Sequence, residues 1–150
     1  MRKVNNQLVE SLELLLSTIG RWIKIAHRQC IDKYKELDLT EHQYKVLKVL
    51  KAGGPYKMME LGDIIHTSSG SLTVMIDRLV AKDMAERFFM AEDRRVVMVA
   101  ITGTGEKALE QFRNGLIAIL TDKINGFDAE KQRKIAEAVR ELQGVFEDIS

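Results

Sequence analysis

The fold is decided by residues 68–80, which read SSGSLTVMIDRLV. Ser68 is a good helix N-cap, because its hydroxyl can accept a hydrogen bond from the free backbone N–H groups of a first helical turn. Apolar side chains then recur at helical spacing and form one stripe, made of Leu72, Met75, Ile76 and Leu79. The stretch therefore predicts an amphipathic helix that packs on a core through this stripe.

The opposite face of this helix is short and uncharged at its N-terminal end, where it carries Ser69, Gly70, Thr73 and Val74. A helix with small outward side chains can approach another surface closely. Ser69, Ser71 and Thr73 can also donate hydrogen bonds to phosphates or base edges. Gly70 costs about 1 kcal/mol of helix stability relative to alanine, and it either permits close approach or has no special role.

The segments on both sides of this helix predict a winged helix. Leu61, Ile64 and Ile65 would form the inner face of a short preceding helix. After it, residues 85–90 and 96–102 are rich in β-branched and aromatic residues, as strands are, and the charged segment 91–95 separates them. Such a unit can place its second helix in a DNA major groove and its hairpin in the adjacent minor groove.

The same segment resembles the MarR family of bacterial transcriptional regulators. The resemblance is carried by the order and spacing of four motifs, which are Asp77-Arg78-Leu79 followed by Lys82, Glu86-Arg87, Asp93-Arg94-Arg95, and Ile101-Thr102-Gly103-Thr104-Gly105. The last is similar to the family's Leu-Thr-x-x-Gly signature. The resemblance covers nearly the whole chain, although the sharp motifs lie between Leu61 and Gly105.

The resemblance implies a set of DNA-binding residues. In the family pattern, the Asp of Asp-x-Arg holds an Arg that enters the minor groove, and Asp93 and Arg95 fill these places. A narrow A·T-rich minor groove attracts such a guanidinium. Arg94 would contact a neighbouring phosphate, whereas the plain alternative for the whole tip is a solvated charged turn. The candidates on the recognition helix are Ser68, Ser69, Gly70, Ser71, Thr73, Val74 and Arg78.

The chain also departs from the family pattern. Lys or Arg is common in the family where this chain has Ser69 or Val74. Asp83 stands where glycine is usual, so we expect a different conformation in the turn after the recognition helix.

Net charge gives little support for DNA binding. The chain has a formal net charge of +1, and the segment from Tyr56 to Thr102 contains six basic and seven acidic residues. Positive charge is instead concentrated near the first predicted helix, on Arg2, Lys3, Arg21, Lys24, Arg28, Lys33 and Lys35. We therefore expect few phosphate contacts per half-site.

Both ends of the chain predict long apolar-striped helices. Residues 4–34 carry a heptad-like seam that a single small domain cannot cover on both sides. The seam comprises Leu8, Leu12, Leu15, Ile19, Trp22, Ala26 and Cys30. Two further stripes follow, Leu109, Phe112, Leu116, Ile119, Leu120 and Ile124, then Ile135, Val139, Leu142, Phe146 and Ile149. A core helix is one interpretation of the seam, but we favour a homodimer, because the C-terminal stripes offer it a matching partner. The resemblance implies the same, since in the MarR family such helices intertwine across a two-fold axis.

Another helix is predicted after residue 40. Thr40 and Gln43 have the spacing of a capping box, and the glycine pair at 53 and 54 permits a left-handed stop.

Cys30, the only cysteine, raises the alternative of a redox sensor. A reactive thiolate needs a helix N-terminus or cationic neighbours, but Cys30 falls on the seam, so we favour a buried structural cysteine. A small-molecule effector pocket is a further hypothesis, with Trp22, Tyr44 and Met58 as candidate lining; the alternative for these side chains is plain core.

Other function classes find little support. The three histidines have no metal-ligand spacing, and there is no Gly-x-Ser-x-Gly elbow, phosphate-cradling glycine loop or dinucleotide fingerprint. We expect no enzyme, no metal and no cofactor. Because the longest apolar stretch is too short to span a bilayer and no secretory leader is present, we expect a cytoplasmic protein without a membrane partner.

The sequence thus predicts a mainly α fold with a small β-hairpin wing (α+β). Residues 1–150 would form a single MarR-like domain, with a winged helix-turn-helix at about 36–103 flanked by helical dimerisation regions at 1–35 and 104–150. The expected function is a homodimeric regulator, more specifically a repressor, which binds a pseudo-palindromic operator in double-stranded DNA and is released by a small-molecule effector. The alternatives are a winged-helix protein-interaction module and the Cys30 redox sensor.

Overall fold

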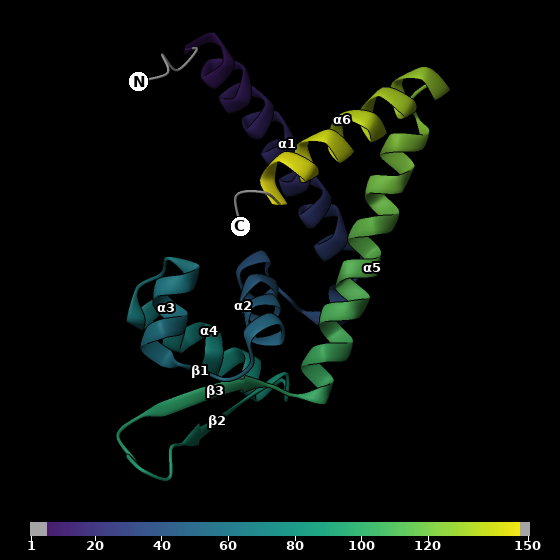
Figure 1. Ribbon diagram of the computed structural model, residues 1–150. Coiled ribbons are helices and arrows are strands. Elements are labelled where there is room, and N and C mark those ends of the chain that lie inside the picture. Colours follow the sequence, from purple (N-terminus) through teal and green to yellow (C-terminus); the bar gives the residue numbers. More distant parts are fainter. Residues whose placement is uncertain (1–5, 148–150) are drawn as a thin grey trace. The chain divides into compact units, whose positions relative to one another are not determined.

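The computed structural model describes residues 6–147 of the chain. Its helices and strands are shown in Figure 1. The chain divides into two compact units, which meet between Leu116 and Ile117. We describe each unit by itself.

The first unit begins with helix α1, Asn6–Lys33, followed by a short 3-10 turn, Lys35–Leu37, and helix α2, Glu41–Gly53. The predicted capping box of α2 is confirmed: Gln43 N–H donates to Thr40 Oγ1 over 3.2 Å, and Thr40 N–H donates to Gln43 Oε1 over 3.0 Å. Gly54, with φ of +84°, ends the helix.

The helix-turn-helix consists of α3, Met58–Ile65, and α4, Ser69–Ala81. Ser68 caps α4 as predicted, because its hydroxyl accepts from Ser71 N–H. The predicted stripe of α4 is also confirmed, with Leu72, Ile76 and Leu79 buried. The inner face of α3 was predicted incorrectly in part: Leu61 is buried, but Ile64 is 45% exposed.

The wing is a hairpin of β2, Ala85–Phe89, and β3, Val97–Ile101. The pairing is antiparallel and includes Arg87 with Val99 and Phe89 with Val97. A third strand, β1 at Tyr56–Lys57, pairs with the other edge of β3. This strand was not predicted from the sequence. Figure 1 shows the β2–β3 hairpin reaching beyond the helices of this unit.

The turn after α4 keeps the conformation that glycine favours, contrary to our expectation. Asp83 has φ of +54°, in the left-handed region. Its carboxylate accepts a hydrogen bond from the Thr104 hydroxyl over 3.0 Å. This contact fastens the turn to the first residues of helix α5, Gly103–Asn125.

The core of the first unit lies among α2, α3, α4 and β3, and it extends to the C-terminal third of α1 and the start of α5. Its fully buried side chains include Val46, Leu47, Leu50, Leu61, Leu72, Ile76, Leu79, Val99 and Phe112. Two glycines of α5 allow close packing: a Cβ on Gly105 would lie 2.0 Å from the Met84 carbonyl oxygen, and one on Gly115 would lie 2.3 Å from the Tyr34 ring.

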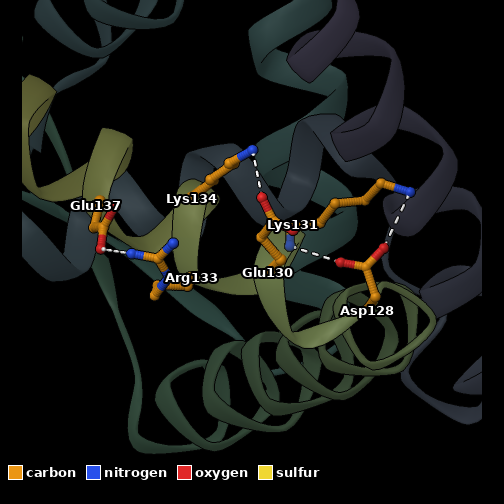
Figure 2. A network of polar contacts seen from close by, with 6 residues as sticks. All are labelled: Asp128, Glu130, Lys131, Arg133, Lys134 and Glu137. Atoms are coloured by element: carbon orange, nitrogen blue, oxygen red, sulfur yellow. Dashed lines mark hydrogen bonds and ion pairs between the residues drawn. The ribbon is translucent and has the colours of Figure 1, made fainter.

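The second unit contains the end of α5 and helix α6, Ala129–Glu147. Asp128 caps α6, because its carboxylate accepts a hydrogen bond from Lys131 N–H over 2.8 Å. Figure 2 shows this cap beside two ion pairs along the helix, Lys134–Glu130 at 2.8 Å and Arg133–Glu137 at 3.3 Å. No residue of α6 is buried within the chain. Ile149, the last member of its predicted stripe, lies outside the described residues.

Candidate nucleic-acid interface

The outward face of α4 presents the small side chains predicted for it. Ser69, Gly70, Ser71 and Thr73 are exposed, and Val74 is 50% exposed. A Cβ on Gly70 would have no heavy atom within 4 Å, so no packing within the chain requires glycine there. The N-terminal half of α4 is therefore open to a close approach by another surface.

The hydroxyl groups of this face are partly engaged within the helix itself. Thr73 donates to the Ser69 carbonyl over 2.8 Å, and Ser68 donates to Ser71 Oγ over 3.0 Å. The Thr73 proton is thus directed to the backbone, which leaves its oxygen as an acceptor. Ser69 and Ser71 keep hydroxyl protons for an external acceptor.

The wing tip holds Arg95 in the arrangement that the sequence predicted. The Arg95 side chain is 92% exposed, yet Asp93 Oδ1 accepts from both its backbone N–H, over 3.0 Å, and its Nε, over 3.2 Å. These two bonds restrict the base of the side chain and leave the rest of the guanidinium pointing outward. Arg94 beside it is also exposed.

Arg87 joins the wing to the recognition helix, a role that sequence reasoning did not assign. Its guanidinium forms an ion pair with Asp77 and donates to the Thr73 carbonyl of α4 over 3.3 Å. Glu86-Arg87 had been singled out only as a family motif. Because Asp77 is thereby paired, one acidic charge near the recognition face is neutralised.

Arg78 lies toward the far end of α4, by a shallow depression shared with Asp38 and Lys82. Lys82 and Asp38 form an ion pair of 2.7 Å. The hydrogen bond and charge of Lys82 lower the pKa of Asp38, and Arg78 contributes in the same direction. Arg78 therefore interacts electrostatically with Asp38 of the same chain, although it remains exposed.

A groove of about 710 Å³ separates α4 from the wing. Met58 and Met59 of α3, Leu72 and Thr73 of α4, and Phe88, Phe89 and Val97 of the wing line it, and its rim includes Lys57, Arg87 and Arg95. Met59 is 78% exposed and Phe89 is 64% exposed. This groove was not predictable from the sequence, because it depends on the register of β2 and β3.

The three candidates for an effector pocket lie in different environments. Met58 lines the groove beside the wing. Tyr44 is buried, with its ring centroid 4.6 Å from that of Phe112 and 5.5 Å from that of His27. Trp22 is on α1 and 39% exposed. The structure thus does not gather these side chains around one cavity.

His27 is a buried group whose environment the sequence did not indicate. It is 7% exposed, and no described residue forms a hydrogen bond with its Nδ1. Burial lowers the pKa of His27, an effect that Lys45 and Lys48 reinforce and Glu41 opposes. The residue is therefore held neutral within the ring cluster.

Cys30 has the environment of a structural cysteine. It is fully buried, and its thiol donates to the Phe112 carbonyl over 3.4 Å. Burial raises the pKa of this thiol, against a smaller opposing effect of Lys33. These features are the opposite of those that make a thiol reactive.

Residues 6–147 contain no group of three or more His, Cys, Asp or Glu side chains placed to hold a metal ion. In the same range, no helix has both the length and the apolarity needed to cross a membrane.

Comparison with known proteins identifies the family. The MarR family model matches residues 39–97. An uncharacterised helix-turn-helix transcriptional regulator of Bacillus subtilis, YpoP, is 32% identical over 110 residues, which are 73% of this chain and 75% of YpoP. The chain belongs to the MarR family.

Two further proteins resemble the chain over most of its length. The transcriptional repressor MdtR of B. subtilis is 25% identical over 140 residues, covering 93% of this chain and 88% of MdtR. A solved structure of a MepR mutant from S. aureus, bound to an oligodeoxyribonucleotide, covers 90% of this chain and 97% of that chain, with a TM-score of 0.66 and 17% identity. The winged-helix fold and the assignment to transcriptional regulation rather than catalysis are thus confirmed.

Proposed function

We infer that this MarR-family regulator is a repressor that binds a pseudo-palindromic operator as a homodimer. The observation that carries this proposal is the pairing of an open, small-residue face on α4 with an exposed Arg95 held by Asp93 at the wing tip. The two features are those needed to contact a major groove and the adjacent minor groove.

On this proposal the contacts divide by role. Ser69, Gly70, Ser71, Thr73 and Val74 approach the major groove, with Ser68 at the head of the helix. Arg95 enters the minor groove, Arg94 contacts a phosphate, and Asp93 orients Arg95. Arg78 reaches the DNA at the far end of α4, in competition with its attraction to Asp38.

The similarity to MepR, whose mutant was solved with an oligodeoxyribonucleotide, supports DNA as the partner. The name of MdtR supports repression. Membership of the MarR family and the buried thiol of Cys30 are consistent with action in the reducing cytoplasm.

Dimerisation is supported by the apolar side chains that the chain leaves exposed on its terminal helices. On α1, Leu8, Leu14 and Leu16 are 60 to 68% exposed, and on α6, Val145 and Phe146 are more than half exposed. Large apolar side chains exposed in this number are typical of an interaction surface. A two-fold dimer would present two copies of α4 to half-sites about 34–36 Å apart.

A small-molecule effector is the least supported part of the proposal, and it rests on the family resemblance. Such a ligand would act by changing the separation of the two recognition helices. Its measurable consequence is a loss of operator affinity at a fixed salt concentration.

One observation favours a second candidate, a winged-helix module that binds another protein. Three of the basic side chains near the interface already have carboxylate partners, namely Arg87 with Asp77, Arg95 with Asp93 and Lys57 with Glu60. A protein surface could use the groove and α4 without any need for positive charge.

A DNA titration separates the two candidates. Footprinting on the promoter region of the protein's own gene locates the site, and fluorescence anisotropy then measures the affinity at several salt concentrations. The regulator should bind with affinity that falls as salt rises. Arg95→Ala should weaken binding roughly tenfold or more, whereas Arg133→Ala on α6 should not. Equal affinity of the Arg95 and Arg133 variants would remove Arg95 from its role, and absence of any protected site would favour the protein-interaction module.

A further inference from the structure

We propose that the groove between α4 and the wing is a contact surface for the DNA strand that separates the two DNA grooves, with Phe89 as its principal contact. This inference rests on the proposed DNA-binding function and adds to it a non-ionic contribution to affinity. The segments concerned are α3, α4 and the β2–β3 hairpin, which Figure 1 shows in one part of the first unit.

The position of the groove determines its occupant. A major and a minor groove of B-DNA are separated by one sugar–phosphate strand. If α4 lies in the first and Arg95 in the second, that strand must pass over the surface between them. The groove occupies this surface, since Ser69 and Thr73 of α4 line one side and Arg95 and Val96 of the wing line the other.

The register of the wing places Phe89 in this groove. Side chains on one face of a strand recur every second residue, so Arg87 and Phe89 share a face of β2. Their partners on β3 are Val99 and Val97. Val99 is fully buried, which shows that this face is turned toward the core, and its outer end carries the 64% exposed Phe89. Arg87 in turn contacts α4.

The chemistry of the groove suits a nucleotide strand. Its apolar lining includes Met58, Leu72 and Phe89, and its rim holds the cations Lys57, Arg87 and Arg95. Deoxyribose and the thymine methyl group offer apolar contacts, whereas the phosphates lie at the edges where cations can meet them. The groove is thus complementary to a strand both in charge and in apolar surface.

A non-ionic contribution to affinity would also compensate for the lack of net positive charge in this region. The segment from Tyr56 to Thr102 has one more acidic than basic residue, and the three rim cations are shared with carboxylates. Few phosphates are therefore neutralised on binding. Burial of Phe89 and Met59 would supply affinity that does not depend on salt.

The experiment compares affinity and salt dependence in the full-length protein on its footprinted duplex. Phe89→Ala should lower the affinity about tenfold and leave the slope of log K against log salt unchanged. The affinity of Phe89→Leu, which keeps an apolar side chain, should lie between those of Phe89→Ala and the wild type. Arg94→Ala should instead lower the magnitude of the slope by about one per protomer. Ile64→Ala is the matched control, because Ile64 is exposed on α3 but does not line the groove.

Thermal unfolding of each variant verifies that the fold is retained, which the exposure of Phe89 leads us to expect. If the wild type binds and Phe89→Ala binds as tightly, the groove is not a DNA contact and the proposal is overturned. That result would leave the DNA-binding function intact and would make the groove available to an apolar ligand or protein segment. If the wild type binds no duplex, the proposed function itself fails, and this inference fails with it.

Discussion

The winged unit and the terminal helices carry the same kind of apolar stripe, but the stripe is buried in the first and exposed in the second. In α4, Leu72, Ile76 and Leu79 are at most 1% exposed. In α6, Val139 is 47% exposed and Leu142 is 39% exposed, and no residue of that helix is buried. Helical periodicity therefore predicts which side chains share a face, but it does not tell what covers that face.

The difference divides the described residues into a part with a core of its own and a part whose apolar side chains stay exposed. The winged unit surrounds its apolar stripes with three helices and a sheet. Among the described residues, the N-terminal two thirds of α1 and all of α6 contain no buried side chain. The junction between the two kinds of region is the His27, Tyr44 and Phe112 ring cluster, where α1 meets α2 and α5.

The largest effect is expected from a charge placed in the uncovered stripe. Leu142→Glu should convert the proposed dimer into monomers, since an ionised carboxylate is costly to bury in an apolar interface. Loss of the second half-site should lower operator affinity roughly a hundredfold or more. Sedimentation equilibrium and the DNA titration measure the two effects.

Glu141→Gln is the control for this variant, because Glu141 precedes Leu142 and lies off the stripe. It should leave both the mass and the affinity as in the wild type. A Leu142→Glu protein that still sediments as a dimer would show that α6 is not part of the interface.

The next effect, on stability rather than on DNA binding, is expected from removing apolar volume in the covered stripe. Leu79→Ala should lower the free energy of unfolding by about 2–5 kcal/mol, because a fully buried leucine leaves a cavity. The neighbouring Val80→Ala should cost less than about 1 kcal/mol, since Val80 is 38% exposed. Denaturant titration gives both values, and equal losses would contradict the contrast between buried and exposed stripes.

The smallest effect is a pH dependence of thermal stability, caused by His27 at the junction. The pKa of His27 in the folded state is lowered from 6.5 by burial, so the unfolded chain binds the proton more readily. This contribution to stability is complete above about pH 6.5 and is lost as the pH falls through the lowered value. The melting temperature should therefore decrease between pH 7.5 and 5.5.

His27→Phe provides the control, because it keeps an aromatic ring in the cluster and has no group to protonate. Its melting temperature should vary less over the same interval. The carboxyl groups of Asp38 and Asp128, whose pKa values are lowered from 3.8 by hydrogen bonds, titrate below this interval. A parallel pH profile in the wild type and in His27→Phe would show that His27 contributes nothing.

The local parts of the fold were predictable, and the reasons are visible in particular residues. The Thr40–Gln43 capping box, the Ser68 cap and the Asp93–Arg95 contact each join residues two or three positions apart. Such contacts depend only on local backbone geometry. Strand β1 escaped prediction because it has two residues, follows Pro55 and is recognisable only through its pairing with Met98 and Val99.

The candidate site was predictable in its membership but not in its internal connections. The small face of α4 and the arginines of the wing could be read from the sequence. The ion pair of Arg87 with Asp77 could not, because it joins β2 to α4. The expectation of a different turn at Asp83 was wrong, since Asp83 adopts the left-handed backbone that usually favours glycine. Its carboxylate also accepts a hydrogen bond from Thr104, which is 21 residues away in the sequence.

The sequence alone determined where the helices and wing strands lie, which side chains cap them and which family the chain resembles, because these depend on neighbours within a few residues. Only the tertiary structure decided that Phe89 shares a groove with α4, that His27 is buried beside Tyr44 and Phe112, and that the described stripe of α6 is exposed. Those properties arise from strand register and from packing between distant segments, which no local pattern specifies.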